Sequence, residues 1–295
     1  MKQVAIVGAG FAGLAAAYFL SDQFKVTLFD AKGVGGGASG AAAGLIHPYP
    51  GEEGRRSWHA TEALELAKQL VGEVEAATGR PVADRGGIIR LKPMIEPGDD
   101  VVVLGENRFL ITSGMTIFPD LYLQGLWQVL QGKGVELVTR HVGSTEALKA
   151  FDTVVLAAGF GIREFEEGKQ LKVGFVKGQL LTCVLEKPLE RSVIGATYRA
   201  VTAHPLQCYL GATYEREFAD ENPDLPVAIH NLLPTSPVLE CRAGIRVTNR
   251  AHYFPIVEQL SEKVWVVTAL GSRGLLYHAL LGFRLNRLLR EMGSL

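Results

Sequence analysis

The first thirty residues constrain the fold of this chain more than any other stretch. A short apolar run, 4–7, leads into Gly8-Ala9-Gly10-Phe11-Ala12-Gly13 and then into small apolar residues up to Leu20. A second strand-like run follows and ends at Asp30. This order of strand, glycine turn, helix, strand and acid is typical of a βαβ unit that binds a dinucleotide.

Each glycine of this motif has a physical role. Gly8 permits the tight turn, and Gly10 lets the backbone approach a pyrophosphate. Gly13 lets the helix pack closely on the strand, and the helix N-terminus directs free N–H groups toward the phosphates. Asp30 follows at the distance where a carboxylate accepts hydrogen bonds from ribose hydroxyls. A purely structural glycine turn would not require the acid or the second strand.

Length and charge narrow the class of protein further. The 295 residues are enough for one large domain or two interleaved ones. Hydrophobic residues make up 47% and charged residues 21%, as in a globular protein. The net charge of −1 excludes a global electrostatic field that attracts nucleic acid or an anionic membrane, although it leaves local patches open.

The apolar stretch 4–20 resembles a signal peptide or membrane anchor, but its glycine spacing and strand-like entry favour a βα unit. We therefore expect a cytoplasmic protein without a membrane segment. Cys183, Cys208 and Cys241 are far apart and form no CxxC pair, so neither a disulfide framework nor a metal site is expected.

A second cluster of small residues, 33–44, follows Asp30. A nicotinamide-binding domain does not need it, whereas an enzyme that holds a flavin in a buried slot uses small residues to bring backbone amides close. A flexible linker is the alternative, but the alanine-rich composition argues against it. His47 follows shortly after and precedes a proline; we interpret it as structural rather than as a covalent attachment point.

The middle of the chain changes character. An amphipathic helix is expected over 55–76 and another over 116–131. Between them, strands at 86–92, 101–104 and 108–112 are separated by turn sequences and indicate an antiparallel sheet.

The parallel pattern then returns in strands at 134–138 and 152–159, the second of which ends in small residues. A second group of short strands and turns occupies 173–257, with a helix over 224–233. The strands expected there are 179–184, 193–198 and 207–214. A buried strand at 263–270 turns through Gly271-Ser272-Arg273-Gly274 into an apolar helix, whose N-terminus can stabilise negative charge.

These patterns predict an α/β fold with two interleaved domains. A Rossmann-like domain carrying the GxGxxG motif is expected from three discontinuous segments, 1–85, 134–172 and 254–295. An α+β domain with an antiparallel sheet, expected from 86–133 and 173–253, would bind the substrate.

Five segments together resemble the D-amino-acid oxidase/glycine oxidase (DAO) family of FAD-dependent oxidoreductases. They are the GxGxxG motif, Gly37-Ala38-Ser39-Gly40, Lys177-Gly178-Gln179, Gly244-Ile245-Arg246 and Gly271-Ser272-Arg273-Gly274-Leu275. The stretches 37–40, 211–214, 241–246 and 269–275 are in addition similar to the oxidoreductase half of the MnmC family of tRNA wobble-uridine modification enzymes.

The resemblance implies oxidation of a C–N bond beside a carboxylate: a hydride passes to N5 of a non-covalent FAD, and water hydrolyses the resulting imine. It implies that Arg246 binds the substrate carboxylate, as a guanidinium can through two hydrogen bonds. Arg273 is expected beside the flavin, and Tyr198 and Tyr214 are weaker candidates for substrate hydrogen bonds.

The cofactor contacts that the resemblance and the glycine motifs imply are numerous. They are Gly8, Gly10, Phe11, Ala12, Gly13, Asp30, Ala31, Ala38, Ser39, Gly40, Gly44, Leu45, Val142, Ala158, Gly159, Gly271, Ser272, Arg273, Gly274 and Leu275.

Three hypotheses about function remain at this point. The substrate is the carboxymethylaminomethyl-uridine of tRNA, or a free small amino acid such as glycine, sarcosine or a D-amino acid, or the chain is a flavin-binding redox module without turnover. The sequence shows no separate NAD(P)H motif, so oxygen, a quinone and a partner protein all remain open as electron acceptor.

Overall fold

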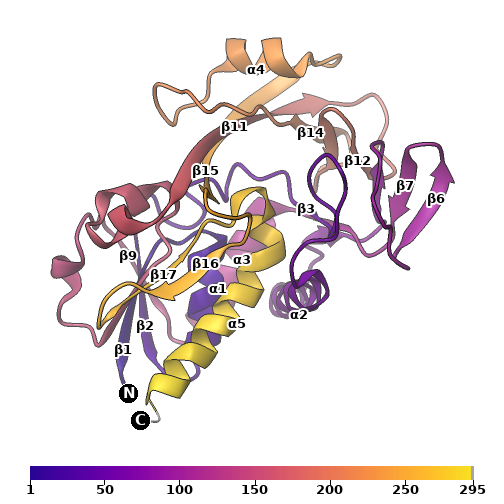
Figure 1. Ribbon diagram of the computed structural model, residues 1–295. Coiled ribbons are helices and arrows are strands. Elements are labelled where there is room, and N and C mark those ends of the chain that lie inside the picture. Colours follow the sequence, from indigo (N-terminus) through magenta and orange to yellow (C-terminus); the bar gives the residue numbers. More distant parts are fainter. Residues whose placement is uncertain (294–295) are drawn as a thin grey trace.

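The computed structural model describes residues 1–293 and contains two large sheets, one above the other, with most helices packed beside the lower one (Figure 1). None of the helices in this part of the chain is long and apolar enough to cross a bilayer. The residues described contain no group of His, Cys, Asp or Glu side chains able to hold a metal ion.

The lower sheet is the dinucleotide-type sheet that the first thirty residues predict. Its strand order is β16-β17-β10-β1-β2-β9, and all neighbours run parallel except β16 and β17. The strands span Gln3–Val7 (β1), Lys25–Asp30 (β2), Glu136–Thr139 (β9), Thr153–Leu156 (β10), Ile256–Gln259 (β16) and Val264–Thr268 (β17).

The side-chain alternation of β1 explains why both faces of this sheet are covered. Val4 and Ile6 point into the larger core, and Ala5 and Val7 point into a second core on the opposite face. Four α-helices build the larger core: Phe11–Leu20 (α1), Ala60–Thr78 (α2), Pro119–Gly132 (α3) and Gly274–Gly293 (α5). Short 3-10 turns cover the other face: Thr145–Leu148 (η1), Gly159–Glu164 (η2) and Glu167–Gln170 (η3).

The upper sheet has eight strands in the order β15-β11-β14-β13-β12-β5-β7-β6. Only β12 and β5 pair in parallel. The strands span Ile88–Arg90 (β5), Val101–Gly105 (β6), Arg108–Ile111 (β7), Val173–Val184 (β11), Ser192–Ile194 (β12), Tyr198–Val201 (β13), Gln207–Gly211 (β14) and Val238–Asn249 (β15). The helix Leu225–Leu232 (α4) lies on the outer side of this sheet (Figure 1).

A small three-stranded sheet connects the two parts of the molecule. It is formed by Leu45–Ile46 (β3), Ala83–Asp84 (β4) and Met115–Ile117 (β8), with β8 in the centre. The mixed α/β fold is thus confirmed. Sheet membership supports the division into two domains, whose boundaries stay a prediction.

Several element boundaries were wrong. The expected strand 193–198 is interrupted: residues 195–197 form the turn between β12 and β13, where the N–H of Gly195 donates to the carbonyl of Thr197. Helix α2 begins at Ala60 rather than 55, because His59 takes a left-handed conformation with φ 46° just before it. The segment 173–257 holds two twelve-residue strands, β11 and β15, and not only short ones.

Candidate active site

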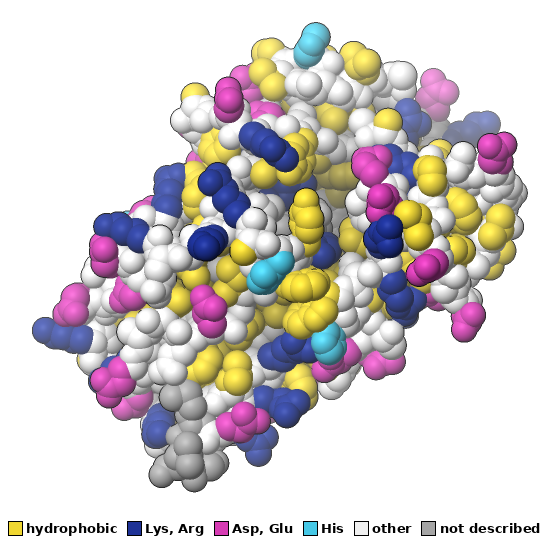
Figure 2. Space-filling model, in the orientation of Figure 1, with side chains coloured by type: hydrophobic (Ala, Val, Ile, Leu, Met, Phe, Trp, Pro, Cys, Tyr) yellow, Lys and Arg dark blue, Asp and Glu magenta, His cyan; other side chains and the backbone are white. Residues whose placement is uncertain are grey.

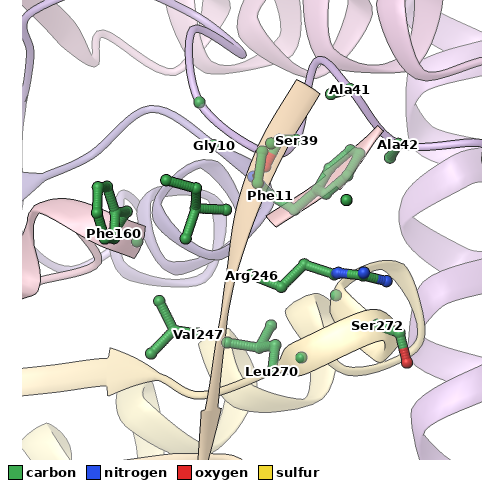
Figure 3. A pocket seen from close by; sticks show the side chains of 18 of the residues that line it. Gly10, Phe11, Ser39, Ala41, Ala42, Phe160, Arg246, Val247, Leu270 and Ser272 are labelled. Carbon is green, nitrogen blue, oxygen red and sulfur yellow. The ribbon is translucent and has the colours of Figure 1, made fainter. Parts of the chain in front are cut away.

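A cavity of about 840 Å³ lies between the two sheets. Its walls come from the β1–α1 loop, the small-residue segment after β2, strands β11 and β15, and the start of α5. Figure 3 shows Arg246 reaching across this space, with Phe11 and Ala42 on one side and Leu270 and Ser272 on the other. The cavity thus touches both the dinucleotide sheet and the upper sheet.

The GxGxxG loop forms one end of the cavity, and its glycines are sterically required. Gly8 has φ +111°, and a Cβ there would lie 2.2 Å from the carbonyl oxygen of Ala157. A Cβ on Gly13 would lie 1.8 Å from the carbonyl oxygen of Gly8. Gly10 is the N-cap of α1 and provides no side-chain cap, so the first turn of the helix keeps N–H groups available for an anion.

Asp30 closes the loop from the other side. Its Oδ2 accepts a hydrogen bond from the N–H of Ala9 at 2.8 Å, and its Oδ1 accepts one from the N–H of Lys32 at 2.8 Å. The carboxylate also lines the cavity. Each carboxylate oxygen has a further lone pair, so Asp30 can hold the glycine loop and still accept from a ribose hydroxyl.

The small-residue segment 33–44 is a compact set of turns and not a linker. Ser39 Oγ accepts from the N–H of Phe11 at 3.0 Å, which ties the segment to the start of α1. A Cβ on Gly44 would lie 1.8 Å from the carbonyl oxygen of Ile117, and one on Gly244 would lie 2.7 Å from the Cα of Ala38. The glycines therefore let three backbones meet at the cavity wall.

A second helix N-terminus faces the same cavity. Strand β17 leads through the 3-10 turn Gly271–Arg273 (η4) into α5, and Gly271, Ser272, Gly274 and Leu275 line the space. The guanidinium of Arg273 turns away: it donates to the carbonyl oxygen of Tyr253 and lies over the ring of Tyr277 at 5.3 Å. Arg273 is therefore not part of the cavity wall.

Arg246 is the cation that the upper sheet directs into the cavity. Its Nη2 donates to the carbonyl oxygen of Thr213 at 3.2 Å, and no carboxylate of the described chain pairs with it. The side chain fits because Gly178 lies beneath it; a Cβ there would lie 2.6 Å from Nη2. Burial lowers the pKa of Arg246, because the charged guanidinium has lost contact with solvent.

Two tyrosines flank this guanidinium. Tyr198 lines the cavity, and its hydroxyl has no hydrogen-bond partner within the residues described. Burial raises the pKa of Tyr198 to about 12, against the opposing influence of Arg246, so the hydroxyl is protonated and able to donate. Tyr214 is 63% exposed, and its ring lies between Arg246 at 5.7 Å and Arg216 at 5.6 Å.

Most of the expected cofactor contacts line this one cavity. Those that do are Gly8, Gly10, Phe11, Ala12, Asp30, Ala31, Ala38, Ser39, Gly44, Leu45, Val142, Ala158, Gly159, Gly271, Ser272, Gly274 and Leu275. Gly13 and Gly40 lie just behind the wall, where each permits a close backbone contact. Their individual roles toward a cofactor stay predictions.

Two residues of the cavity wall, Arg90 and His47, were not predicted from the sequence to line it. Arg90 is only 1% exposed and donates to the carbonyl oxygens of Tyr49, Gly51, Glu52 and Pro93, so it fixes the loop that covers one side of the cavity. Nothing in the sequence around Arg90 marks it as buried.

His47 lines the cavity beside Arg90. Burial, reinforced by Arg90, lowers its pKa to about 4. Its Nδ1 accepts from the N–H of Tyr49 at 3.3 Å, so the proton of the neutral ring is on Nε2.

Together, a glycine loop at a helix N-terminus, an acid after the second strand and a second helix N-terminus on the same cavity define a dinucleotide-dependent enzyme with a separate substrate sheet. The chain belongs to the family of FAD-dependent oxidoreductases named DAO, whose family model matches residues 3–288.

Known proteins similar to the chain agree with this assignment. The chain is 27% identical, over 304 residues, to the tRNA 5-methylaminomethyl-2-thiouridine biosynthesis bifunctional protein MnmC of Maricaulis maris (strain MCS10). The match covers 94% of this chain and 50% of that protein, so the chain spans about half the length of the curated relative it matches.

Solved structures show the same fold. Glycine oxidase from Geobacillus kaustophilus aligns with a TM-score of 0.83 at 20% identity, covering 98% of this chain and 94% of that one. Iminodiacetate oxidase (IdaA) from Chelativorans sp. BNC1 aligns with a TM-score of 0.79 at 17% identity, covering 98% and 95%.

The cavity fits FAD. Gly10, Phe11 and Ala12 at the start of α1 line the cavity, and Gly10 provides no side-chain cap, so the helix N-terminus suits a pyrophosphate. The start of α5 would hold the negative charge of a reduced flavin ring. When bound, FAD supplies the redox chemistry by accepting two electrons and a proton as a hydride.

Proposed function

We propose that this protein oxidises the C–N bond of an amine that carries a carboxymethyl group, and that the substrate is the carboxymethylaminomethyl group of an RNA wobble uridine. The observation that carries the proposal is Arg246, a guanidinium without a carboxylate partner in the described chain that points into the FAD cavity. A substrate carboxylate would provide the partner that this guanidinium lacks.

The substrates that the relatives are named for support the amine. Glycine and iminodiacetate, after which two of the similar structures are named, both contain an N–CH₂–carboxylate unit. MnmC is named for the biosynthesis of a methylaminomethyl uridine in tRNA, and this group is a secondary amine carried by a nucleoside. That name supports an amine on RNA, and the carboxylate of the proposed substrate is inferred from Arg246.

The residues of this chain divide the work as follows. Arg246 binds and orients the carboxylate, and Thr213 holds the guanidinium through its backbone carbonyl. The protonated hydroxyl of Tyr198 donates a second hydrogen bond to the substrate. The amine must enter in its neutral form, because its lone pair assists the departure of the hydride, and a cation beside it favours that form.

Anaerobic bleaching of the bound flavin tests the proposal. An RNA stem-loop with carboxymethylaminomethyl-uridine should bleach it, and the same stem-loop with unmodified uridine should not. Glycine, sarcosine and D-amino acids form the comparison panel. Bleaching by a free amino acid alone would make the protein a small-molecule amine oxidase and would refute the RNA substrate.

The Arg246→Met variant tests the carboxylate site. We expect it to reduce the second-order rate of flavin bleaching at least about 100-fold, since a charge-assisted bidentate contact is lost. The Arg246→Lys variant keeps the positive charge but lacks the planar guanidinium. Its rate of flavin bleaching should lie between those of Arg246→Met and the parent. An unchanged rate in Arg246→Met would show that another group binds the carboxylate.

A further inference from the structure

A group of exposed rings lies on the surface next to the cavity. We name Trp58, His252, Tyr253 and Phe254 the aromatic shelf. Tyr253 is 84% exposed and Phe254 43% exposed. The ring centroids of His252 and Phe254 are 5.2 Å apart, and those of Phe254 and Trp58 are 5.5 Å apart. Such exposed large rings need a reason, because folding alone does not require them on a surface.

The loop that carries three of these rings is ordered by its own hydrogen bonds. Asn249 Oδ1 accepts from the N–H groups of Ala251 and His252, and Asn249 Nδ2 donates to the carbonyl oxygen of Phe254 at 3.1 Å. The N–H of Phe254 donates to His252 Nδ1 at 3.2 Å. A ligand that stacks on this loop therefore finds it pre-organised, with little conformational entropy left to lose.

The shelf is joined to the cavity wall. Thr248, at the end of β15, forms a β-bridge with Leu270, which lines the cavity. Arg273 follows the cavity residues Gly271 and Ser272 directly and donates to the carbonyl oxygen of Tyr253. A molecule bound on the shelf is therefore beside residues of the cavity wall.

One cation contacts a ring of the shelf, and two more lie at the base of its loop. Arg284 lies over Trp58 at 4.4 Å, although it also pairs with Glu62 at 3.5 Å. Arg250 and Lys172 are neighbours through a 2.8 Å backbone hydrogen bond, and both are exposed. Within the described chain, neither of these two forms an ion pair with a carboxylate. Figure 2 shows hydrophobic, histidine and Lys or Arg side chains gathered near the middle of this face, over the start of α5.

Exposed rings beside unpaired cations match unpaired nucleotides, whose bases stack on aromatic side chains while their phosphates contact arginine and lysine. A protein partner would need a wider apolar surface than these four rings provide. We propose that the aromatic shelf binds unpaired nucleotides of an RNA loop, with one base stacked on Tyr253. This inference rests on the proposed function, because it names what holds the RNA that carries the reacting uridine.

The test compares RNA binding with chemistry in the FAD-loaded protein. Fluorescence anisotropy measures the affinity for a labelled anticodon stem-loop, and for an RNA duplex without unpaired bases as control. The variants are Tyr253→Leu, which keeps apolar volume but removes the ring, and Tyr253→Phe, which keeps the ring. Leu233→Ala, at a residue 74% exposed at the end of α4, is the surface control.

We expect Tyr253→Leu to weaken stem-loop binding about tenfold, the loss of one stacked base. Tyr253→Phe and Leu233→Ala should stay within about twofold of the parent. The rate of flavin bleaching at saturating concentrations of the modified stem-loop should be the same in all four proteins, because Tyr253 lies outside the cavity lining.

The two proposals fail in different ways. The proposal for the shelf is overturned if Tyr253→Leu binds the stem-loop as tightly as the parent does, or if the parent binds the stem-loop no better than the duplex. This holds even if the modified RNA bleaches the flavin. A tenfold effect of Tyr253→Leu on binding, without any bleaching by the modified RNA, supports the shelf and overturns the RNA substrate.

Discussion

Tyr198 shows how a single side chain in the cavity can be tested apart from the charge of Arg246. Burial raises its pKa to about 12, so its hydroxyl stays protonated throughout the range in which the enzyme is assayed. Tyr198→Phe removes one hydrogen bond to a charged substrate group. We expect KM for the amine substrate to rise about tenfold.

The control is the pH profile of kcat/KM. Because Tyr198 does not ionise below its raised pKa, the profile between pH 6 and 9 should have the same shape in Tyr198→Phe as in the parent. A shifted profile would show that Tyr198 takes part in proton transfer. An unchanged KM would remove it from the substrate site.

His278 makes a second residue-level prediction, about acid stability. It is fully buried; its ring bonds to the hydroxyl of Tyr122 at 2.5 Å through Nε2 and to the carbonyl oxygen of Leu275 at 2.7 Å through Nδ1. Burial lowers its pKa to about 4, from 6.5 in a solvated histidine. The neutral form is favoured in the folded state, so this stability is present above pH 6.5 and is lost as the pH falls toward 4.

Urea unfolding at a series of pH values measures this effect. We expect His278 to account for about 3 kcal/mol of the free energy of unfolding lost between pH 6.5 and 4. The slope of the free energy of unfolding against pH should fall, in His278→Asn, by the amount that corresponds to about one proton. His230→Asn, at an exposed site, is the control and should leave this slope unchanged. His47, whose pKa is also lowered to about 4, leaves a residual slope in both variants.

The sequence was informative about residues whose role follows from backbone geometry. Gly8, Gly10 and Gly13 occupy positions where the structure has no room for a Cβ. Arg90 could not be found in the same way, because its role depends on carbonyl groups from a loop 38 to 41 residues earlier in the chain. A buried arginine is satisfied by tertiary contacts, and a local pattern does not contain them.

At the level of elements, a glycine in α5 and a glycine in α2 provide a matched pair of tests of the contact between α1 and α5. Gly282 in α5 packs on α1, and a Cβ there would lie 2.7 Å from the carbonyl oxygen of Ala15. Gly72 in α2 is exposed, with nothing within 4 Å of an added Cβ. We expect Gly282→Ala to cost about 1–3 kcal/mol of the free energy of unfolding, through overpacking.

Gly72→Ala should have the opposite sign and gain about 0.5–1 kcal/mol, because alanine is the better helix former at an unhindered position. Chemical denaturation of both variants in parallel measures the difference. Equal effects of the two substitutions would mean that the α1–α5 contact is not as close as the structure has it.

Elements with a strong local pattern were predicted, and elements defined by their neighbours were not. The β1–α1–β2 unit and the β17–α5 unit follow from continuous apolar runs. Strand β15 was missed because its inward positions carry residues such as Arg246 and Gly244, which serve the cavity and not a hydrophobic core. The β12–β13 turn was missed because Val193-Ile194 and Tyr198 together read as one strand.

The cavity that fits FAD is lined by residues of both large sheets. FAD in the cavity should therefore stabilise the entire fold by mass action. At a free FAD concentration 100 times Kd, we expect about 2.7 kcal/mol of added stability. Differential scanning fluorimetry of the FAD-depleted protein, with and without FAD, measures the shift.

ADP is the matched ligand for this comparison, since it reaches the glycine loop but not Arg246. At the same multiple of its own Kd it should give the same added free energy, but protease cleavage in the upper sheet should be suppressed by FAD alone. Equal protection of the upper sheet by ADP and FAD would show that the flavin end does not hold the two sheets together.

The strand order of the parallel sheet has a consequence for how the protein is made. Strand β1 is synthesised long before its neighbour β10, which begins at residue 153, and before α5, which packs on α1 and begins at residue 274. The glycine loop thus leaves the ribosome long before the surfaces that bury it. Its apolar flanks must stay accessible, or be shielded by a chaperone, until those later segments have been synthesised, and we expect FAD to be captured only after α5 has emerged.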